Sequence, residues 1–112
     1  MTGQKHVELR ALLDVATLIA NRAIADLAEA QSVHADIENR LGALAQSITN
    51  QPLVGFDDAV VHTRWLSVCQ DKRAQLLEDL SDAHSVRKPL LAIARKAEGK
   101  RQALQELFDQ VS

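Results

Sequence analysis

The sequence predicts an all-α protein folded as a long antiparallel two-helix coiled-coil hairpin. In its first half, apolar residues recur at alternating spacings of four and three, which is the heptad pattern of a coiled coil. Ala and Leu are abundant while aromatic residues make up only 3% of the chain, which is typical of long helices. Only four Gly and two Pro interrupt the 112 residues, so we expect few turns and no multi-stranded sheet.

The first helix is expected over residues 5–49. Its seam, meaning the heptad positions that face the other helix, is apolar at every position except His34. The helix should end near Asn50, because Asn tolerates the left-handed conformation at a helix C-terminus and Pro52 cannot continue the helix. The predicted seam positions are Leu9, Leu13, Ala16, Ala20, Ala23, Leu27, Ala30, His34, Ile37, Leu41, Leu44 and Ile48.

A linker is expected at residues 50–57 and the second helix at residues 58–110. Asp57 or Asp58 offers a carboxylate to the free backbone amides at the start of that helix. A short connection between two long amphipathic helices favours an antiparallel hairpin. The second seam reads Ala59, His62, Leu66, Cys69, Arg73, Leu76, Leu80, Ala83, Arg87, Leu90, Ala94, Ala97, Arg101, Leu104, Phe108 and Val111.

A hairpin that closes near residues 53–54 pairs positions whose numbers sum to about 107, so that Leu27 lies opposite Leu80. In this register the three seam arginines face small or polar residues. Arg73, Arg87 and Arg101 would lie opposite His34, Ala20 and His6. An arginine can lay its stem on the seam and keep its charge in water. Alternatively, the buried stripe drifts toward Val86 and Ile93 and leaves the arginines at the flank.

Pro89 lies inside the second predicted helix, where it removes a backbone hydrogen bond and clashes with the carbonyl of Ser85. The heptad phase nevertheless continues across it, so we predict a kink near residue 89 within one helix. The alternative is a three-helix bundle that breaks at Pro89, with the proline in the first turn of the last helix. Either arrangement gives a single helical domain over residues 1–112.

The chain has more apolar side chains than one two-helix seam buries. Leu12, Val15 and Ile19 form a second stripe beside the first seam, and Val61, Trp65 and Val68 do the same near the hairpin tip. Val86, Leu91, Ile93 and Leu107 widen the stripe of the second helix. These residues either complete a wider core or form a surface for a partner or a second copy, and we favour such a surface.

Basic residues cluster in the second helix. The run holds Arg87, Lys88, Arg95, Lys96, Lys100 and Arg101 against one acid, Glu98. These cations either pair with acids of the first helix or dock onto an acidic protein surface. We do not expect nucleic-acid binding, because no aromatic side chain is interleaved with the cations and the net charge is −2. The candidate partner-binding residues are Leu12, Val15, Ile19, Val61, Trp65, Val68 and the six cations.

No catalytic residue, cofactor site or metal site is predicted. His6, His34 and His62 follow the seam at intervals of 28 residues, so an antiparallel hairpin holds them too far apart to share a metal. We expect hydrogen-bonded histidines at the seam or its flank. Cys69 falls on the seam and should be a buried, inert thiol. The carboxylate pair Glu78 and Asp79 has no histidine partner, so the chain is expected not to be an enzyme.

Neither a transmembrane segment nor a secretory signal is expected. No apolar run approaches the ~18 residues that span a bilayer. The first six residues, Met1 to His6, are not followed by the apolar core of a signal peptide. A single cysteine fits a reducing compartment. We therefore expect a cytoplasmic protein that does not insert into membranes.

The stretch from Ala94 to Phe108 alternates basic residues with Ala and Leu before a final Leu. It resembles the C-terminal helix of the FliJ-like flagellar export proteins, which are short cytoplasmic α-helical hairpins. The resemblance implies a non-enzymatic adaptor of a flagellar or type III export apparatus that binds the export ATPase and substrate chaperones. It transfers no site residue. The alternative is a small oligomeric helical bundle of regulatory or structural role.

Overall fold

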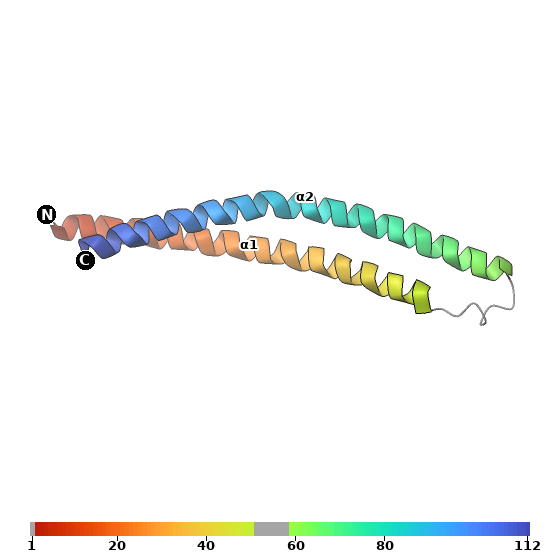
Figure 1. Ribbon diagram of the computed structural model, residues 1–112. Helices are drawn as coiled ribbons and strands as arrows, with labels where there is room; N and C mark the ends of the chain where they lie inside the picture. Colours follow the sequence, from red (N-terminus) through yellow and green to blue (C-terminus); the bar gives the residue numbers. More distant parts are fainter. Residues whose placement is uncertain (1, 51–58) are drawn as a thin grey trace. The chain divides into compact units, whose positions relative to one another are not determined.

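A computed structural model describes residues 2–50 and 59–112, apart from the side chain of Thr2. It contains two long helices, α1 (Thr2–Asn50) and α2 (Ala59–Val111) (Figure 1). The prediction of an all-α helical hairpin is confirmed, and the described residues include no strand. Both helices begin and end within three residues of their expected bounds. The expected linker after Asn50 and the capping role of Asp57 or Asp58 lie outside the described residues.

Helix α2 continues through Pro89 without interruption. The alternative of a three-helix bundle that breaks at this proline is therefore wrong. Pro89 is exposed, so its ring does not displace a seam side chain, and Leu90 and Ala94 keep their place in the heptad on its far side. The kink expected near residue 89 stays a prediction.

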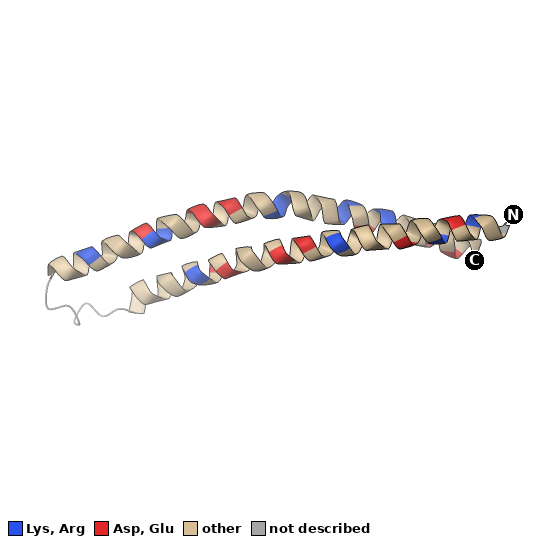
Figure 2. Ribbon diagram, turned by 180° about the vertical axis from the view of Figure 1, so that it is seen from behind, with Lys and Arg blue, Asp and Glu red and all other residues tan. Residues whose placement is uncertain are grey.

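The chain packs as two compact units. The first unit consists of Met1–Gln31 with Val86–Ser112, and the second unit consists of Ser32–Ser85. In each unit a segment of α1 packs against an antiparallel segment of α2, and charged residues occur along both helices (Figure 2). The expectation of a single domain over residues 1–112 stays a prediction.

The core of the first unit is built from alanines. Ala20 is completely buried, and it forms one cluster with Ala23, Ala94 and Ala97, against which Leu27 packs. Because alanine side chains are short, they bury little volume in the seam and leave the larger residues on either side exposed. Leu13, a seam side chain larger than these alanines, is also buried in this unit and is 5% exposed.

The seam of the second unit includes the predicted inert thiol. Cys69 is 5% exposed, which confirms its predicted burial, and its thiol is free. Ala83 is buried as well, while Leu66 and Leu80 are half-buried. The histidine that interrupts the first seam, His34, has a side chain only 13% exposed.

The predicted seam is confirmed along the whole of α1, since all twelve positions are buried or half-buried. In α2 the alternative stripe is wrong, because Val86 and Ile93 are 57% and 54% exposed. Arg87 and Arg101 are half-buried at their seam positions, whereas Arg73 is exposed.

The predicted register is wrong. The ring of His6 lies 4.5 Å from that of Phe108, and the ring of His34 lies 6.4 Å from that of His84. These pairs sum to 114 and 118 rather than 107, so neither histidine faces its expected arginine. The first sum differs from the predicted one by seven, while His84 lies one residue beyond the seam position Ala83 and so gives a larger sum. A shift of seven residues returns every seam position to another seam position. The hydrophobic pattern therefore fits both registers equally well. The predicted register rested on the position of chain closure and on the small or polar residues that it placed opposite the seam arginines.

Candidate functional site

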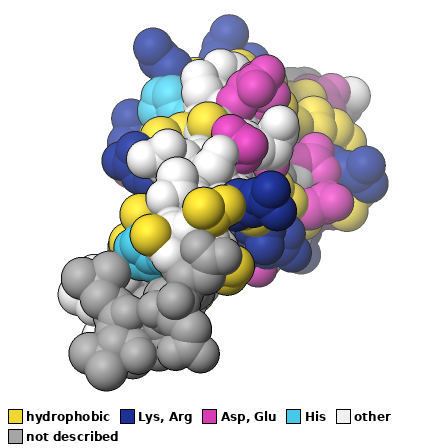
Figure 3. Space-filling model, turned by 90° about the vertical axis from the view of Figure 1, so that its right-hand side faces the viewer, with side chains coloured by type: hydrophobic (Ala, Val, Ile, Leu, Met, Phe, Trp, Pro, Cys, Tyr) yellow, Lys and Arg dark blue, Asp and Glu magenta, His cyan; other side chains and the backbone are white. Residues whose placement is uncertain are grey.

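Three large apolar side chains of α1 stay exposed beside the seam of the first unit. Leu12, Val15 and Ile19 are each 55–57% exposed. Their spacing of three and four residues places them on one face of the helix, as the sequence predicts. Hydrophobic side chains also reach the surface between charged ones in the space-filling view (Figure 3). A contiguous exposed row of this kind is a candidate binding surface.

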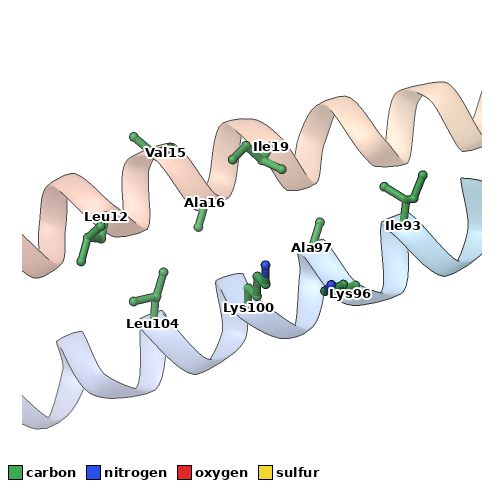
Figure 4. Close-up of a pocket in the computed structure, with 9 residues that line it drawn as sticks. All are labelled: Leu12, Val15, Ala16, Ile19, Ile93, Lys96, Ala97, Lys100 and Leu104. Carbon is green, nitrogen blue, oxygen red and sulfur yellow. The ribbon is translucent and has the colours of Figure 1, made fainter.

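An open groove of about 390 Å³ forms where this row meets α2 (Figure 4). Its lining is mostly apolar and comes from both helices of the first unit. The residues are Leu12, Val15, Ala16, Ile19, Ile93, Lys96, Ala97, Lys100 and Leu104.

The shape of the groove follows from residue size. Ala16 and Ala97 point into the space between the helices, where short side chains leave a hollow (Figure 4). Leu12 and Leu104 point into the same space at one end. The side of the groove formed by α1 is entirely apolar, whereas the side formed by α2 also carries Lys96 and Lys100. The groove can therefore take an apolar surface that has negative charge along one side.

The structure brings five of the predicted partner-binding residues to this groove. They are Leu12, Val15, Ile19, Lys96 and Lys100. Ile93 is also in the lining; the sequence placed it in the widened stripe of the second helix but not among the candidate partner-binding residues. It precedes Lys100 by seven residues and so occupies the same heptad position on the same flank of α2. That spacing is the signal that would have identified it.

The two groove lysines are not engaged by acids of α1. Five ion pairs in the described residues each join two residues of one helix, three or four positions apart. The pairs are Arg10–Asp14, Arg22–Asp26, His34–Glu38, Asp36–Arg40 and Glu98–Arg101. Lys96 and Lys100 are exposed and belong to none of them. The two groove lysines therefore do not show the charge pairing between the helices that was one of our two expectations, and for the rest of the basic run that pairing stays a prediction.

The other cations of the basic run do not join the groove. Lys88 and Arg95 are exposed, and their heptad position places them on the opposite flank of α2 from Lys96 and Lys100. Arg87 is half-buried in the seam. The run is continuous in sequence, but the helix distributes its charges around its circumference.

Arg101 is held by its own helix. Its Nη2 donates a hydrogen bond of 2.6 Å to Oε1 of Glu98, and its Nε donates one of 3.0 Å to Oε2. Hydrogen bonding by Arg101 lowers the pKa of Glu98, and the same bonds raise the pKa of Arg101. This pair keeps one cation of the run occupied within α2.

A separate apolar patch lies in the second unit. Val61 and Val68 are 51% and 50% exposed. The Trp65 ring between them is half-buried and stacks on His62, with ring centroids 6.1 Å apart. The candidate residues from the two predicted stripes therefore fall in different units.

The histidines show packing roles. Nδ1 of His34 lies 2.6 Å from Oε1 of Glu38, which confirms a hydrogen-bonded seam histidine. His6 contacts the ring of Phe108, over which the guanidinium of Arg10 also lies at 5.6 Å from the centroid. Among the described residues no three His, Cys, Asp or Glu side chains are grouped to hold a metal ion.

Across residues 2–50 and 59–112, neither helix has an apolar stretch long enough for a bilayer crossing. No protein-family model, curated protein or solved structure matches this chain.

Proposed function

We propose that this chain is a non-enzymatic protein-interaction adaptor that docks a partner in the groove of its first unit. One observation carries the proposal: Leu12, Val15 and Ile19 stay more than half exposed and line a groove completed by Ile93. Apolar side chains gathered in a concave site are the usual mark of a binding surface.

The apolar side chains of the groove offset the minimum cost of association but do not hold a partner by themselves. Burying a Leu, Val or Ile side chain fully contributes about 1.5–3 kcal/mol. Four side chains that are each about half exposed would then contribute roughly 3–6 kcal/mol on docking. Association costs at least about 4 kcal/mol in lost freedom of motion. The groove side chains alone therefore leave at most about 2 kcal/mol for binding, so a complex needs further contacts such as those of Lys96 and Lys100.

The most specific form of the proposal is a role in a flagellar or type III export apparatus. It is supported by the resemblance of residues 94–108 to the last helix of FliJ-like proteins and by the all-α hairpin. The partner would then be an export ATPase or a substrate chaperone, and the protein would act in the cytoplasm.

Self-association is the second candidate. Exposed apolar side chains also occur in the second unit, at Val61 and Val68, and a small oligomeric bundle would bury both patches. Such a protein would have a regulatory or structural role.

Site-specific photo-crosslinking in cells tests these candidates. A photoreactive residue at Val15, which lines the groove, is compared with one at Arg95, which is exposed on the opposite flank of α2. We expect Val15 to crosslink one distinct protein that Arg95 does not reach. A product outside any export apparatus would remove the export form. Crosslinks to copies of this chain alone would favour the oligomer, and no crosslink at Val15 would contradict docking in the groove.

A further inference from the structure

We infer that the occupant of the groove is an amphipathic helix of another protein, with an apolar row and acidic residues along one flank only. The inference rests on the proposed docking function and specifies the partner. It follows from the asymmetry of the groove, in which Leu12, Val15 and Ile19 form one wall while Lys96 and Lys100 belong to the other.

The dimensions fit a helix. Leu12 to Ile19 extends about 10 Å along α1, and Ile93 to Leu104 extends about 16 Å along α2, at ~1.5 Å per residue. Two to three turns of a partner helix cover that length. A helix that lies between two others presents anchors at positions i, i+3 or i+4, and i+7. The exposed row on α1 has the same spacing.

The charges specify one flank of that helix. Lys96 and Lys100 are one turn apart, exposed, and outside every ion pair of the described residues. Two carboxylates four residues apart on a partner helix have the same separation along its axis. Charge pairs at the rim of an interface mainly set orientation and partner choice. The partner's flank toward α1 should instead be apolar, because Val15 and Ile19 lie there.

A second copy of this chain is a poorer occupant. A two-fold dimer brings the same patch of both copies together. The groove lining contains two lysines and no carboxylate, so such a dimer places like charges beside a shared apolar surface. An acidic foreign helix neutralises the same charges.

Three synthetic helical peptides test the inference on the full chain by fluorescence anisotropy. They share one leucine row and carry on one flank two residues four positions apart, as Glu, Gln or Lys. The wild-type chain should prefer the Glu peptide to the Lys peptide by at least about tenfold, equivalent to about 1.4 kcal/mol. The double variant Lys96→Glu with Lys100→Glu should reverse that preference. Lys88→Glu with Arg95→Glu is the matched control, with the same charge change on the opposite flank, and should keep the wild-type order.

The outcomes separate the inference from the docking function. Equal binding of all three peptides, lost on Leu12→Ser with Ile19→Ser, would keep docking and overturn the acidic partner. If no peptide binds, the inference is overturned. The docking function is then still tested separately, by photo-crosslinking at Val15. A concentration-dependent dimer in sedimentation, abolished by the same serine pair, would assign the groove to a second copy. If the charge-reversed variant loses its helical circular dichroism, salt dependence of the wild-type chain replaces it as the test. The preference of the wild-type chain for the Glu peptide over the Lys peptide must then weaken in high salt, and an unchanged preference would overturn the inference.

Discussion

Two leucines of α1 offer a matched test of the seam. Leu13 is 5% exposed at a seam position of the first unit, whereas Leu18 is 70% exposed on the outer face of the same helix. We compare Leu13→Ala with Leu18→Ala. Both substitutions remove the same atoms and replace Leu with a residue of similar helix propensity, so the difference between them reports burial.

The magnitude follows from the exposed fractions. Leu→Ala removes three carbons, each contributing about 0.8 kcal/mol when fully buried. At Leu13, nearly all of that is lost, which gives about 2 kcal/mol before any cavity is counted. At Leu18 less than a third of the side chain is covered, and the expected loss of about 0.5 kcal/mol is close to that of ordinary surface substitutions. The free energies of unfolding of the variants should therefore differ by about 1.5 kcal/mol.

Urea unfolding followed by circular dichroism at the helical minimum measures both values. The midpoint should fall clearly for Leu13→Ala and hardly at all for Leu18→Ala, with equal slopes. Equal destabilisation by the two substitutions would refute the assigned seam, because it would require Leu18 to be covered as fully as Leu13.

Three further substitutions have defined outcomes. Pro89→Ala should stabilise the chain by about 1–3 kcal/mol in urea unfolding, because it restores a backbone hydrogen bond at an exposed helix position; a loss of stability would contradict an unbroken α2. Ala20→Leu should destabilise it by about 1–3 kcal/mol, because Ala20 is fully buried against Ala94 and Ala97; a neutral result would mean that the site has spare volume. The lowered pKa of Glu98 stabilises the fold above the unfolded-state pKa near 4.5, and that contribution is lost as the pH falls through the folded-state value. Glu98→Gln should therefore weaken the acid dependence of the thermal midpoint below about pH 5, and an unchanged profile would count against the pair with Arg101.

The seam could be predicted from sequence because helical packing leaves a periodic mark on the chain. Every apolar position from Leu9 to Ile48 that matches the heptad is covered in the structure. The register could not be predicted in the same way. Contacts such as His6 with Phe108 depend on where the chain reverses, and a heptad pattern is unchanged by a shift of seven residues. Only a feature that breaks the repeat, such as paired rings or unequal side chains, can choose between registers.

The apolar part of the candidate site was also predictable, because it too repeats along the helix. Leu12, Val15 and Ile19 are recognisable because they repeat beside the seam. The basic run was harder to interpret, because adjacent residues of a helix point about 100° apart. Arg95 and Lys96 are neighbours in sequence, yet their heptad positions place them on opposite flanks of α2. Assigning each cation its heptad position separates the groove lysines from the rest.

The small seam residues connect the stability of the first unit to its proposed function. Alanines such as Ala20 and Ala97 bury little area each, since full burial of one larger side chain contributes about 1.5–3 kcal/mol. The same short side chains let Ala16 and Ala97 form a hollow in which the flanking leucine and isoleucine side chains stay exposed. Larger residues at these two positions would occupy the hollow and cover part of those side chains. The apolar surface that the short seam residues leave uncovered is thus the surface that the groove offers to a partner. The proposed acidic partner helix would cover it and complete the core of this unit.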